Sequence, residues 1–446
     1  MRRFLSLILV CFVGMPASAA EVTTYTLDNG MDVVVLEDHR APVAVQMVWY
    51  RAGAADEPPG VSGIAHFLEH LMFKATDDLA SGELSNTVAR IGGSDNAFTS
   101  WDHTAYFQRV AADRLELVMK MEADRMRDLQ LTEDDITTER QVILEERNQR
   151  TDSDPNSLYG EQWMSALYMN HPYGIPIIGW RQEMEELGLD DAEAFYKKYY
   201  APNNAILIVA GDVDPQEVKA LADTYYGPLE PTPGLGERMR PQEPPQLAER
   251  RLIFEDPRVS DAYVTRNYLA PERDPGAQEE AAALEILSSL LGGNSFTSVL
   301  QRKLVFEDQK ALYTWAYYSG VNYDDTTFGI GILPVPGVSL EDAEAALDKA
   351  LAEFLEEGVD AEQFERVKFQ LRASQIYAED SVQSLARRYG GALSSGLTVE
   401  DVEAWPDILQ AVTEEDVLDA ARNVFDKRHA VTGWVRQPQT EEEVIQ

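Results

Sequence analysis

A proline-rich stretch near the middle of the chain constrains its fold more than any other feature. Residues 229–247, LEPTPGLGERMRPQEPPQL, hold five prolines and two glycines and show almost no apolar periodicity. Such a stretch predicts a linker, because proline lacks a backbone donor and breaks helices and strands. The chain of 446 residues also exceeds the length that one hydrophobic core usually supports. We therefore expect two domains, at residues 20–230 and 248–446, joined by a linker at 231–247.

Strands and helices alternate in a similar order in both halves, which predicts an α+β fold and an internal duplication. The Asn29-Gly30 pair predicts a tight type I′ turn in the first hairpin. Apolar patterns in the first half predict a hairpin at 22–38, a strand at 43–53, a helix at 61–73, a strand at 104–111, helices at 114–126 and 132–150, and a strand at 205–213. Those in the second half predict a strand at 261–270, a helix at 279–293, strands at 311–320 and 325–335, helices at 340–358 and 361–380, and a strand at 430–437.

Residues 1–19, MRRFLSLILVCFVGMPASA, combine a basic start, an apolar run and small residues at Ala17 and Ala19. This is the layout of a secretory signal peptide, and we expect cleavage after Ala19. Cys11 is the single cysteine of the chain, so the exported form is expected to have no disulfide and no thiolate metal ligand. No later stretch approaches the ~20 apolar residues of a transmembrane helix. We expect a periplasmic protein with no membrane span.

The charge balance argues against some classes of partner. The chain carries 38 basic and 77 acidic residues, a net charge of −39. Such a surface repels phosphate backbones and anionic lipid, so we expect no nucleic-acid partner. The acidic excess could favour basic peptides, although solubility alone explains it.

His66, Glu69 and His70 give the strongest chemical signal, in the segment GIAHFLEHLMF. Residues three and four positions apart share a helix face, so both imidazoles and the carboxylate point the same way. Two neutral imidazoles and a third protein ligand, with one open position, make a catalytic zinc site. Glu69 is placed to take a proton from an attacking water rather than to bind metal. A structural helix with satisfied histidines is the alternative, but burying these groups costs free energy unless a metal or partner compensates.

Composition leaves the third ligand open, because the chain offers 77 acidic residues. Two imidazoles and a carboxylate also bind several divalent ions, so the choice of zinc is an expectation from ligand chemistry. We expect one Zn²⁺ per chain.

Several segments in consistent order resemble the pitrilysin-type (insulinase-like) M16 peptidases, whose HxxEH motif inverts the commoner HExxH. The resemblance covers nearly the whole chain after residue 19, and is strongest for the short-chain group that includes mitochondrial processing peptidase and two-subunit bacterial peptidases. It implies two homologous α/β-sandwich halves, each a mainly antiparallel sheet covered by helices, with no metal site in the second half. The matching segments are GIAHFLEHLMFKAT, IGGSDNAFTSWDHTAYF, TERQVILEERNQR, HPYGIPIIGW and YYAPNNAILIVAGDV.

The resemblance implies a third metal ligand within TERQVILEERNQR, where Glu139, Glu145 and Glu146 are the choices. In the family the ligand lies seven residues after another glutamate, which is the spacing from Glu139 to Glu146. Seven residues are about two helical turns, so these two share a face. Glu146 is therefore expected to bind metal and Glu139 to orient a histidine. Glu145 is expected to be a solvated charge.

The resemblance also implies a substrate-binding edge in GGSDNAFTSWDHTAYF, where Asn96 matches the family's asparagine and Ala97 follows it. An exposed strand there would pair with an extended peptide. An ordinary strand after a Gly-Gly turn is the alternative. In the second half, Tyr313 matches a tyrosine that grips substrate, but Phe306 stands where the accompanying arginine belongs. We therefore expect an M16-like partner subunit, or a second copy of this chain, to complete the grip.

These features together predict a zinc-dependent endopeptidase that hydrolyses peptides outside the cytoplasm, as the metal-bearing subunit of a two-subunit enzyme. The resemblance also admits a non-catalytic assembly or scaffold subunit, a role that some relatives have. Such relatives typically lose a ligand or the base, whereas His66, Glu69, His70 and Glu146 are all present here.

Overall fold

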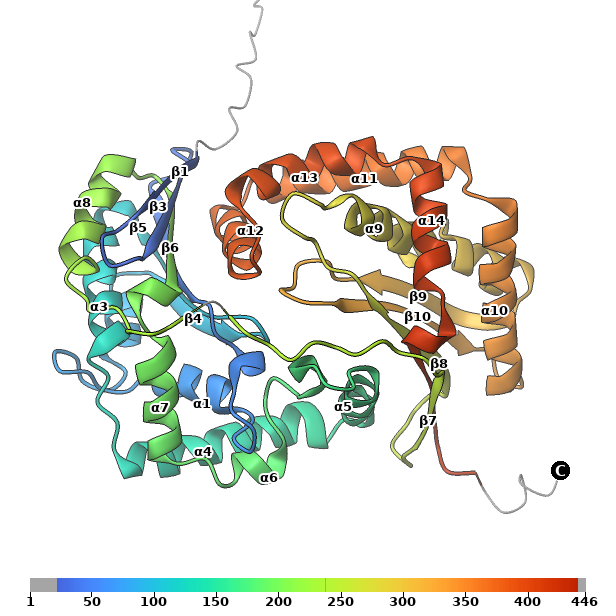
Figure 1. Ribbon diagram of the computed structural model, residues 1–446, viewed down its shortest axis with the longest axis horizontal. Coiled ribbons are helices and arrows are strands. Elements are labelled where there is room, and N and C mark those ends of the chain that lie inside the picture. The colour runs from blue at the N-terminus through green and yellow to red at the C-terminus, as the bar shows by residue number, and fades with distance from the viewer. Residues whose placement is uncertain (1–21, 237, 440–446) are drawn as a thin grey trace, which may run out of the picture.

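Two β-sheets covered by helices make up the part of the chain that the computed structural model describes, residues 22–236 and 238–439 (Figure 1). The signal peptide expected at residues 1–19 lies outside this part. The first sheet has the strand order β1-β2-β6-β3-β5-β4, with bounds β1 Val22–Thr26, β2 Asp32–Glu37, β3 Val43–Tyr50, β4 Ser94–Thr99, β5 Thr104–Ala111 and β6 Ala205–Gly211. The second sheet has the order β7-β11-β8-β10-β9, with bounds β7 Arg250–Glu255, β8 Tyr263–Ala270, β9 Ala311–Tyr318, β10 Thr326–Pro334 and β11 Ala430–Arg436.

Apart from β1, the two sheets repeat one topology. Replacing β2, β6, β3, β5 and β4 by β7, β11, β8, β10 and β9 converts the first strand order into the second. β2 pairs parallel with β6, as β7 does with β11, and the other pairs are antiparallel. The α+β fold with two mainly antiparallel sheets is confirmed, and the shared topology agrees with an internal duplication.

Helices from each half cover one face of that half's sheet with a continuous apolar core. None of the helices in the described ranges is long and apolar enough to cross a membrane. The helices of the first half are α1 Ile64–Leu71, α2 Glu83–Arg90, α3 Leu115–Arg127, α4 Glu133–Arg147, α5 Pro155–Leu167, α6 Arg181–Met184, α7 Leu189–Tyr199 and α8 Pro215–Tyr225, with a π-helical turn, η3, at Asn148–Asp152. Those of the second half are α9 Glu279–Gly292, α10 Leu340–Glu357, α11 Ala361–Ala378, α12 Val382–Ser394, α13 Val399–Ala411 and α14 Glu414–Val424, with a π-helical turn, η6, at Gln301–Glu307.

The other face of each sheet is covered by a helix from the opposite half (Figure 1). Helix α12 packs on β3 and β6 of the first sheet, where Tyr389 shares an apolar cluster with Trp49. In return, α5 packs on the second sheet, where Tyr159 and Leu167 contribute to clusters with Val435 and Val431 of β11. We call this arrangement the helix exchange. Each half therefore completes the core of the other.

The predicted linker forms no helix or strand over its described residues, and it carries an arginine that joins the two halves. The side chain of Arg240 is 2% exposed and forms ion pairs with Asp56 at 3.2 Å, Asp102 at 2.5 Å and Asp324 at 3.1 Å. Asp102 lies in the turn between β4 and β5, and Asp324 lies in the corresponding turn between β9 and β10. The two equivalent hairpins, which contain the edge strands β4 and β9, thus meet on one guanidinium group.

The first hairpin forms, but its turn differs from the sequence-based expectation. Residues 27–31 connect β1 to β2, and Gly30 has a φ of +90° whereas Asn29 is not among the residues with positive φ. A type I′ turn requires positive φ at both central residues, so that prediction is wrong. The Asn29 side chain instead donates from Nδ2 to the carbonyl oxygens of Tyr226 (2.7 Å) and Leu229 (3.1 Å), which ties this loop to the segment after α8.

Candidate metal centre

Helix α1 presents the HxxEH residues from a firmly anchored segment. The carboxylate of Glu57 accepts hydrogen bonds from the backbone N–H groups of Gly63 and Ala65, both at 2.9 Å. These groups lack partners within a helix because they lie in its first turn. Burial raises the pKa of Glu57 well above its usual range, although the same hydrogen bonds oppose that shift. The apolar face of α1 is buried in the first core through Ile64, Ala65, Phe67, Leu68 and Leu71.

Two glycines let α1 approach the loop that precedes α6. Gly63 and Gly179 have φ values of +89° and +92°, which residues with side chains rarely adopt. A Cβ atom at Gly63 would lie 2.6 Å from the carbonyl oxygen of Ile178, and one at Gly179 would lie 2.5 Å from that of Ser62. The HPYGIPIIGW segment therefore packs directly against the start of the helix that carries the site.

Helix α4 supplies the acidic side of the site. It begins after its capping threonine, Thr132, whose side chain accepts from the backbone of the third helical residue. It ends at Arg147, whose buried guanidinium pairs with Glu161 at 2.6 Å and donates to the carbonyl oxygen of Gly179 at 2.8 Å. These contacts fix the end of α4, and with it Glu146, relative to the glycine contact beside α1.

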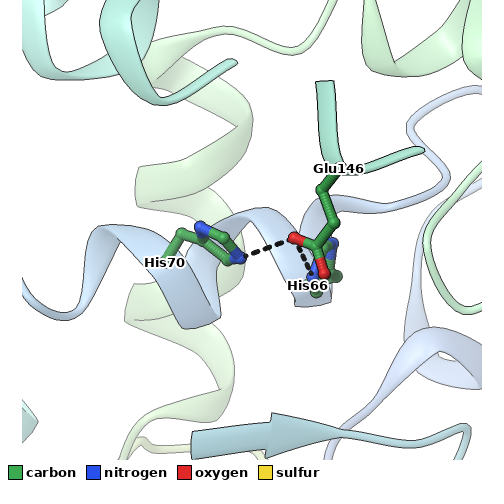
Figure 2. Close-up of side chains that lie close together, drawn as sticks. All are labelled: His66, His70 and Glu146. Carbon is green, nitrogen blue, oxygen red and sulfur yellow. Dashed lines mark ion pairs between the residues drawn. The ribbon is translucent and has the colours of Figure 1, made fainter. Parts of the chain in front are cut away.

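His66, His70 and Glu146 converge from these two helices (Figure 2). Oε2 of Glu146 lies 3.6 Å from Nε2 of His66 and 3.3 Å from Nε2 of His70, and one ligand atom of each residue lies within 4.8 Å of the others. Ligands bound at ~2.1 Å to a tetrahedral zinc ion are about 3.4 Å apart. Donor types and spacing therefore fit zinc. Neither half of the described chain contains a second group of this kind.

Glu139 lies behind His70, on the side away from the other ligand atoms. Its Oε1 is 2.9 Å from Nδ1 of His70, and its Oε2 is 2.7 Å from Nζ of Lys74. Because Nδ1 is engaged, Nε2 of His70 is left to face Glu146. The hydrogen bonds from His70 and Lys74 lower the pKa of Glu139 to about 2. Glu139 thus stays ionised and orients the imidazole.

The two histidines have opposite pKa shifts in the metal-free protein. Burial and the neighbouring His70 lower the pKa of His66 to about 4, so its imidazole is neutral and ready to bind a cation. Burial also acts to lower the pKa of His70, but hydrogen bonds to Glu139 and Glu146 outweigh it and raise that pKa to about 9. His70 must therefore release a proton before it can bind a metal.

Glu69 lies beside these three residues without joining them. Its Oε2 accepts a 2.5 Å hydrogen bond from Oγ1 of Thr99, at the end of β4. Burial raises the pKa of Glu69, and the Thr99 hydrogen bond opposes this shift. A raised pKa brings a carboxylate closer to the working pH and makes it a better proton acceptor. The position and the pKa therefore suit a general base.

His66, Glu69, His70 and Glu146 line an open cavity of about 1150 Å³, which β4 borders. β4 is the outermost strand of its sheet, and Asn96 and Ala97 line the cavity from it. Oδ1 of Asn96 accepts a 2.9 Å hydrogen bond from the N–H of Ala97. A peptide strand that pairs with this N–H must first displace the Asn96 side chain. Tyr313 is not part of this lining, since it lies on β9 at the edge of the second sheet and is 45% exposed.

The structure adds three side chains that the sequence did not single out. Lys74 and Arg150 each follow a predicted site residue by four positions, and Nη1 of Arg150 is 2.6 Å from Oε1 of Glu146. The four-residue spacing of facing helical side chains could have drawn attention to both. Thr99 carried no local signal, because the sheet edge brings it to Glu69 from 30 residues away. Glu145 is exposed, and it lines the same cavity as the candidate ligands.

Two family models match the chain in succession. The model described as Insulinase (Peptidase family M16) matches residues 32–180, which include α1 and α4, and the one described as Peptidase M16 inactive domain matches residues 186–371. The zinc protease PqqE of Helicobacter pylori is 33% identical over 408 residues, which cover 89% of this chain and 88% of that protein. The chain belongs to peptidase family M16. An uncharacterized zinc protease of Mycobacterium leprae is 29% identical over 420 residues, or 93% of this M16 chain and 91% of the relative.

Solved structures share the M16 fold along nearly the whole chain. The crystal structure of a protease from Helicobacter pylori superposes with a TM-score of 0.86 at 28% identity, covering 94% of this chain and 100% of that one. The periplasmic protease PqqL from Escherichia coli has a TM-score of 0.79 at 20% identity, and the match covers 94% of this chain but 48% of PqqL. PqqL is therefore about twice as long as the M16 fold described here.

Proposed function

We propose that this M16 chain is a zinc-dependent endopeptidase that hydrolyses peptides outside the cytoplasm. The observation that carries the proposal is the convergence of His66, His70 and Glu146 beside Glu69 in one open cavity. Relatives named zinc proteases, 33% and 29% identical, support it. A purely structural cluster would leave the buried imidazole of His66 without a hydrogen bond, since its Nδ1 has no partner among the described residues and its Nε2 lies 3.6 Å from Glu146. Burying such a group costs free energy.

The chain's own residues divide the work of peptide hydrolysis. A zinc ion held by His66, His70 and Glu146 would supply Lewis acidity towards a scissile carbonyl. Glu69 accepts a proton from the attacking water and later donates it to the leaving amine nitrogen. Thr99 donates to one carboxylate oxygen of Glu69 and leaves the other free for this transfer. The raised pKa of Glu69 suits a group that takes up and then returns a proton.

The substrate in this proposal is an extended peptide. β4 offers the outer edge of the first sheet beside Glu69, and an added strand would form main-chain hydrogen bonds there. Asn96 would leave the N–H of Ala97 as the peptide binds. Main-chain pairing places a peptide bond beside the base without demanding one particular side chain, which favours unfolded peptides over folded proteins.

We further propose that a second M16 subunit, either a related chain or another copy, completes the substrate grip. Tyr313 is exposed on β9, but the residue seven positions earlier is Phe306 rather than an arginine. PqqL, a neighbour in fold, holds about two lengths of this fold in one chain, which supports pairing of two such units. The signal peptide expected at residues 1–19 supports the periplasm as the proposed site of action.

Metal content and peptide cleavage together test the proposal. The exported chain, residues 20–446, and its His70→Ala variant would be assayed for bound zinc and for cleavage of unstructured peptides, with and without a related M16 chain. We expect one zinc ion per wild-type chain, none in the variant, and efficient cleavage only by the wild type with its partner. Efficient cleavage by the wild type alone would contradict the need for a partner. Stoichiometric zinc without cleavage in any pairing would favour the scaffold role, and absence of zinc would contradict the metal site itself.

A further inference from the structure

Arg150 is the single arginine or lysine among the residues that line the cavity of the candidate metal centre. Its Nη1 lies 2.6 Å from Oε1 of Glu146, whereas Oε2 of the same carboxylate faces both histidines. The two oxygens of Glu146 therefore have different neighbours: Oε1 contacts the guanidinium of Arg150, and Oε2 faces the imidazole nitrogens of α1.

The position of Arg150 is fixed by the π-helical turn η3 rather than by chance contact. The turn follows α4 directly and is held by Arg147, which pairs with Asp152 at 3.3 Å as well as with Glu161. The Arg147 side chain is 5% exposed, so this anchor is buried. π-helical turns inside helical segments are frequent at functional sites, because they redirect side chains. Here the anchored turn directs one arginine into the cavity.

Two of the three candidate ligand residues, His70 and Glu146, are held by similar contacts. His70 is held by Glu139, and Glu139 by Lys74. Glu146 is held by Arg150 in the same way, so each of these two ligands is backed by a contact that ends in a cation. Nδ1 of His66 differs, since it is buried without a hydrogen-bond partner among the described residues.

The burial of Glu146 makes its contact with Arg150 stronger than an ordinary surface pair. Exposed ion pairs contribute at most about 1 kcal/mol because water screens them. The Arg150 side chain is 74% exposed, but that of Glu146 is only 17% exposed. A short hydrogen bond between an ionised donor and an ionised acceptor in such a partly buried place is roughly twice as strong as a neutral one. The contact engages Oε1, whereas Oε2 faces both histidines.

We propose that Arg150 is a positioning residue, which holds Oε1 of Glu146 so that this carboxylate binds the metal ion through Oε2 alone. The inference rests on the proposed zinc site. It deepens that proposal, because binding through one oxygen keeps the ligand set at three atoms and leaves the fourth tetrahedral position open beside Glu69. Without the guanidinium, Oε1 would be free to turn towards the ion and occupy that position.

The test compares Arg150→Gln and Arg150→Lys with wild type and with a control on the same turn. Gln149→Ala is the matched control, since Gln149 lines the same cavity but its side chain donates to Glu145 at 2.8 Å rather than to a ligand. Metal-free proteins would be titrated with zinc against a competing chelator, and cobalt-substituted proteins would be examined by visible spectroscopy. The visible bands of bound cobalt weaken as its coordination number rises above four. The spectrum therefore shows whether Oε1 of Glu146 also binds the ion, without any assay of activity.

We expect Arg150→Gln to weaken zinc binding by about 10–100-fold, as is typical when a residue that supports a metal ligand is removed. Its cobalt bands should weaken at the same time. Arg150→Lys keeps the charge but loses the planar fork, and its affinity should be intermediate. Gln149→Ala should match wild type in both measurements. If Arg150→Gln does not fold, as judged by circular dichroism, the lysine variant carries the test.

Wild-type affinity and an unchanged cobalt spectrum in the folded Arg150 variants would overturn this inference while leaving the zinc site intact. Weakened binding with an unchanged cobalt spectrum would also overturn it, because the effect would then be one of charge alone. A wild-type protein that binds no zinc would instead remove the metal centre, and the inference with it. The titration of the wild-type protein therefore distinguishes failure of the Arg150 inference from failure of the zinc site.

Discussion

The two halves of this M16 chain share one strand order, but the helix that follows the equivalent strands β3 and β8 differs between them. In the first half this helix is α1, eight residues that include His66, Glu69 and His70. In the second half it is α9, fourteen residues of mainly alanine and leucine, which carries Glu285 but no histidine. The shared sheet topology therefore permits the candidate metal centre without creating it. The two halves differ at this point because a few side chains on α1 and α4 form the candidate site in the first half.

Separating the two halves should disturb the protein most severely. Because of the helix exchange, residues 22–247 alone would lack α12 on the first sheet, and residues 248–439 alone would lack α5 on the second. Each piece would then expose an apolar sheet face, and such a face drives aggregation. We expect neither piece to give a monodisperse folded protein, whereas co-expression should restore one. Size-exclusion chromatography and near-ultraviolet circular dichroism would show this. A folded, monomeric single half would contradict the importance of the exchange.

Replacing one carboxylate in each half tests whether α1 and α9 differ in their chemistry. Glu69→Gln should lower kcat for peptide cleavage by about 10²–10⁴-fold, the usual contribution of a general base. Zinc content should stay at the wild-type level, because Glu69 is not among the converging ligand residues. The control is Glu285→Gln on α9, whose pKa burial raises in the same direction, and it should leave kcat unchanged. Equal losses in both variants would mean that the first-half carboxylate has no special role.

The Arg240 junction tests whether the halves behave as one unit. Arg240→Met removes the only cation that contacts all three of Asp56, Asp102 and Asp324 in the described structure. Among the described residues, Asp56 would keep Arg238 and Asp324 would keep His171, but the buried Asp102 would have no cation left. Leaving such a buried charge without its partner costs about 3–5 kcal/mol. The free energy of unfolding in urea should fall by that amount. Arg422→Met is the control, since Arg422 pairs with Asp419 on the exposed face of α14 and should cost less than about 1 kcal/mol. A similar small loss for Arg240→Met would mean that the junction is not tightly packed.

Glycine contacts test how closely each exchanged helix fits its sheet. A Cβ atom at Gly390 of α12 would clash with the buried ring of Trp49 on β3. Overpacking of this kind typically costs about 1–3 kcal/mol, so Gly390→Ala should lower the free energy of unfolding by that amount. Gly391→Ala is the matched control, because nothing lies within 4 Å of its Cβ position. Alanine should stabilise α12 there by about 0.5–1 kcal/mol. Opposite signs for neighbouring glycines would establish the fit by thermal or urea unfolding.

A pH dependence of zinc binding is expected to arise in the first half. His70 has a pKa of about 9 in the metal-free protein, so zinc must displace a proton at neutral pH. Apparent zinc affinity should rise about tenfold per pH unit from about pH 7 to about pH 9 and then level off. The protonated His70 stabilises the metal-free fold fully below about pH 6.5, and this stabilisation is lost as pH rises through about 9. Competitive zinc titrations across this pH range would show both the rise and the levelling of the affinity.

A variant of Glu139 separates this cause from general pH effects. Glu139 forms the hydrogen bond that contributes most to raising the pKa of His70. In Glu139→Gln the levelling of zinc affinity should therefore move to lower pH. An unchanged profile would mean that the proton displaced by zinc comes from another group.

The sequence was sufficient for the architecture where local patterns decide it. Apolar periodicity and the proline-rich linker predicted two α+β halves, and the repeated strand order agrees with the predicted duplication. The turn at Asn29 was mispredicted because the Asn29 side chain donates hydrogen bonds to carbonyl oxygens that follow α8, far away in the sequence. Turn preferences describe isolated hairpins, and they cannot anticipate a tertiary hydrogen bond from the turn residue.

The candidate site could be predicted only where helical spacing brings residues together. His66 and His70 share a face of α1, and Glu139 and Glu146 share a face of α4. Thr99 could not be found in this way, because it meets Glu69 through the geometry of a sheet edge. The helix exchange could not be predicted either, because an apolar helix face indicates that the helix is buried but not which of two similar sheets it covers.

The helix exchange also bears on the origin of the chain. If α5 and α12 occupy equivalent places, then a half-length ancestor would have had one such helix and no second half to receive it. Its apolar face would fit the sheet of another copy, which would make the ancestral unit a twofold dimer with reciprocally donated helices. Fusion of two genes through a linker such as residues 229–247 would then preserve a working interface and free one copy of the active centre to change. On this view the loss of metal ligands from the second half followed from a partnership that already existed.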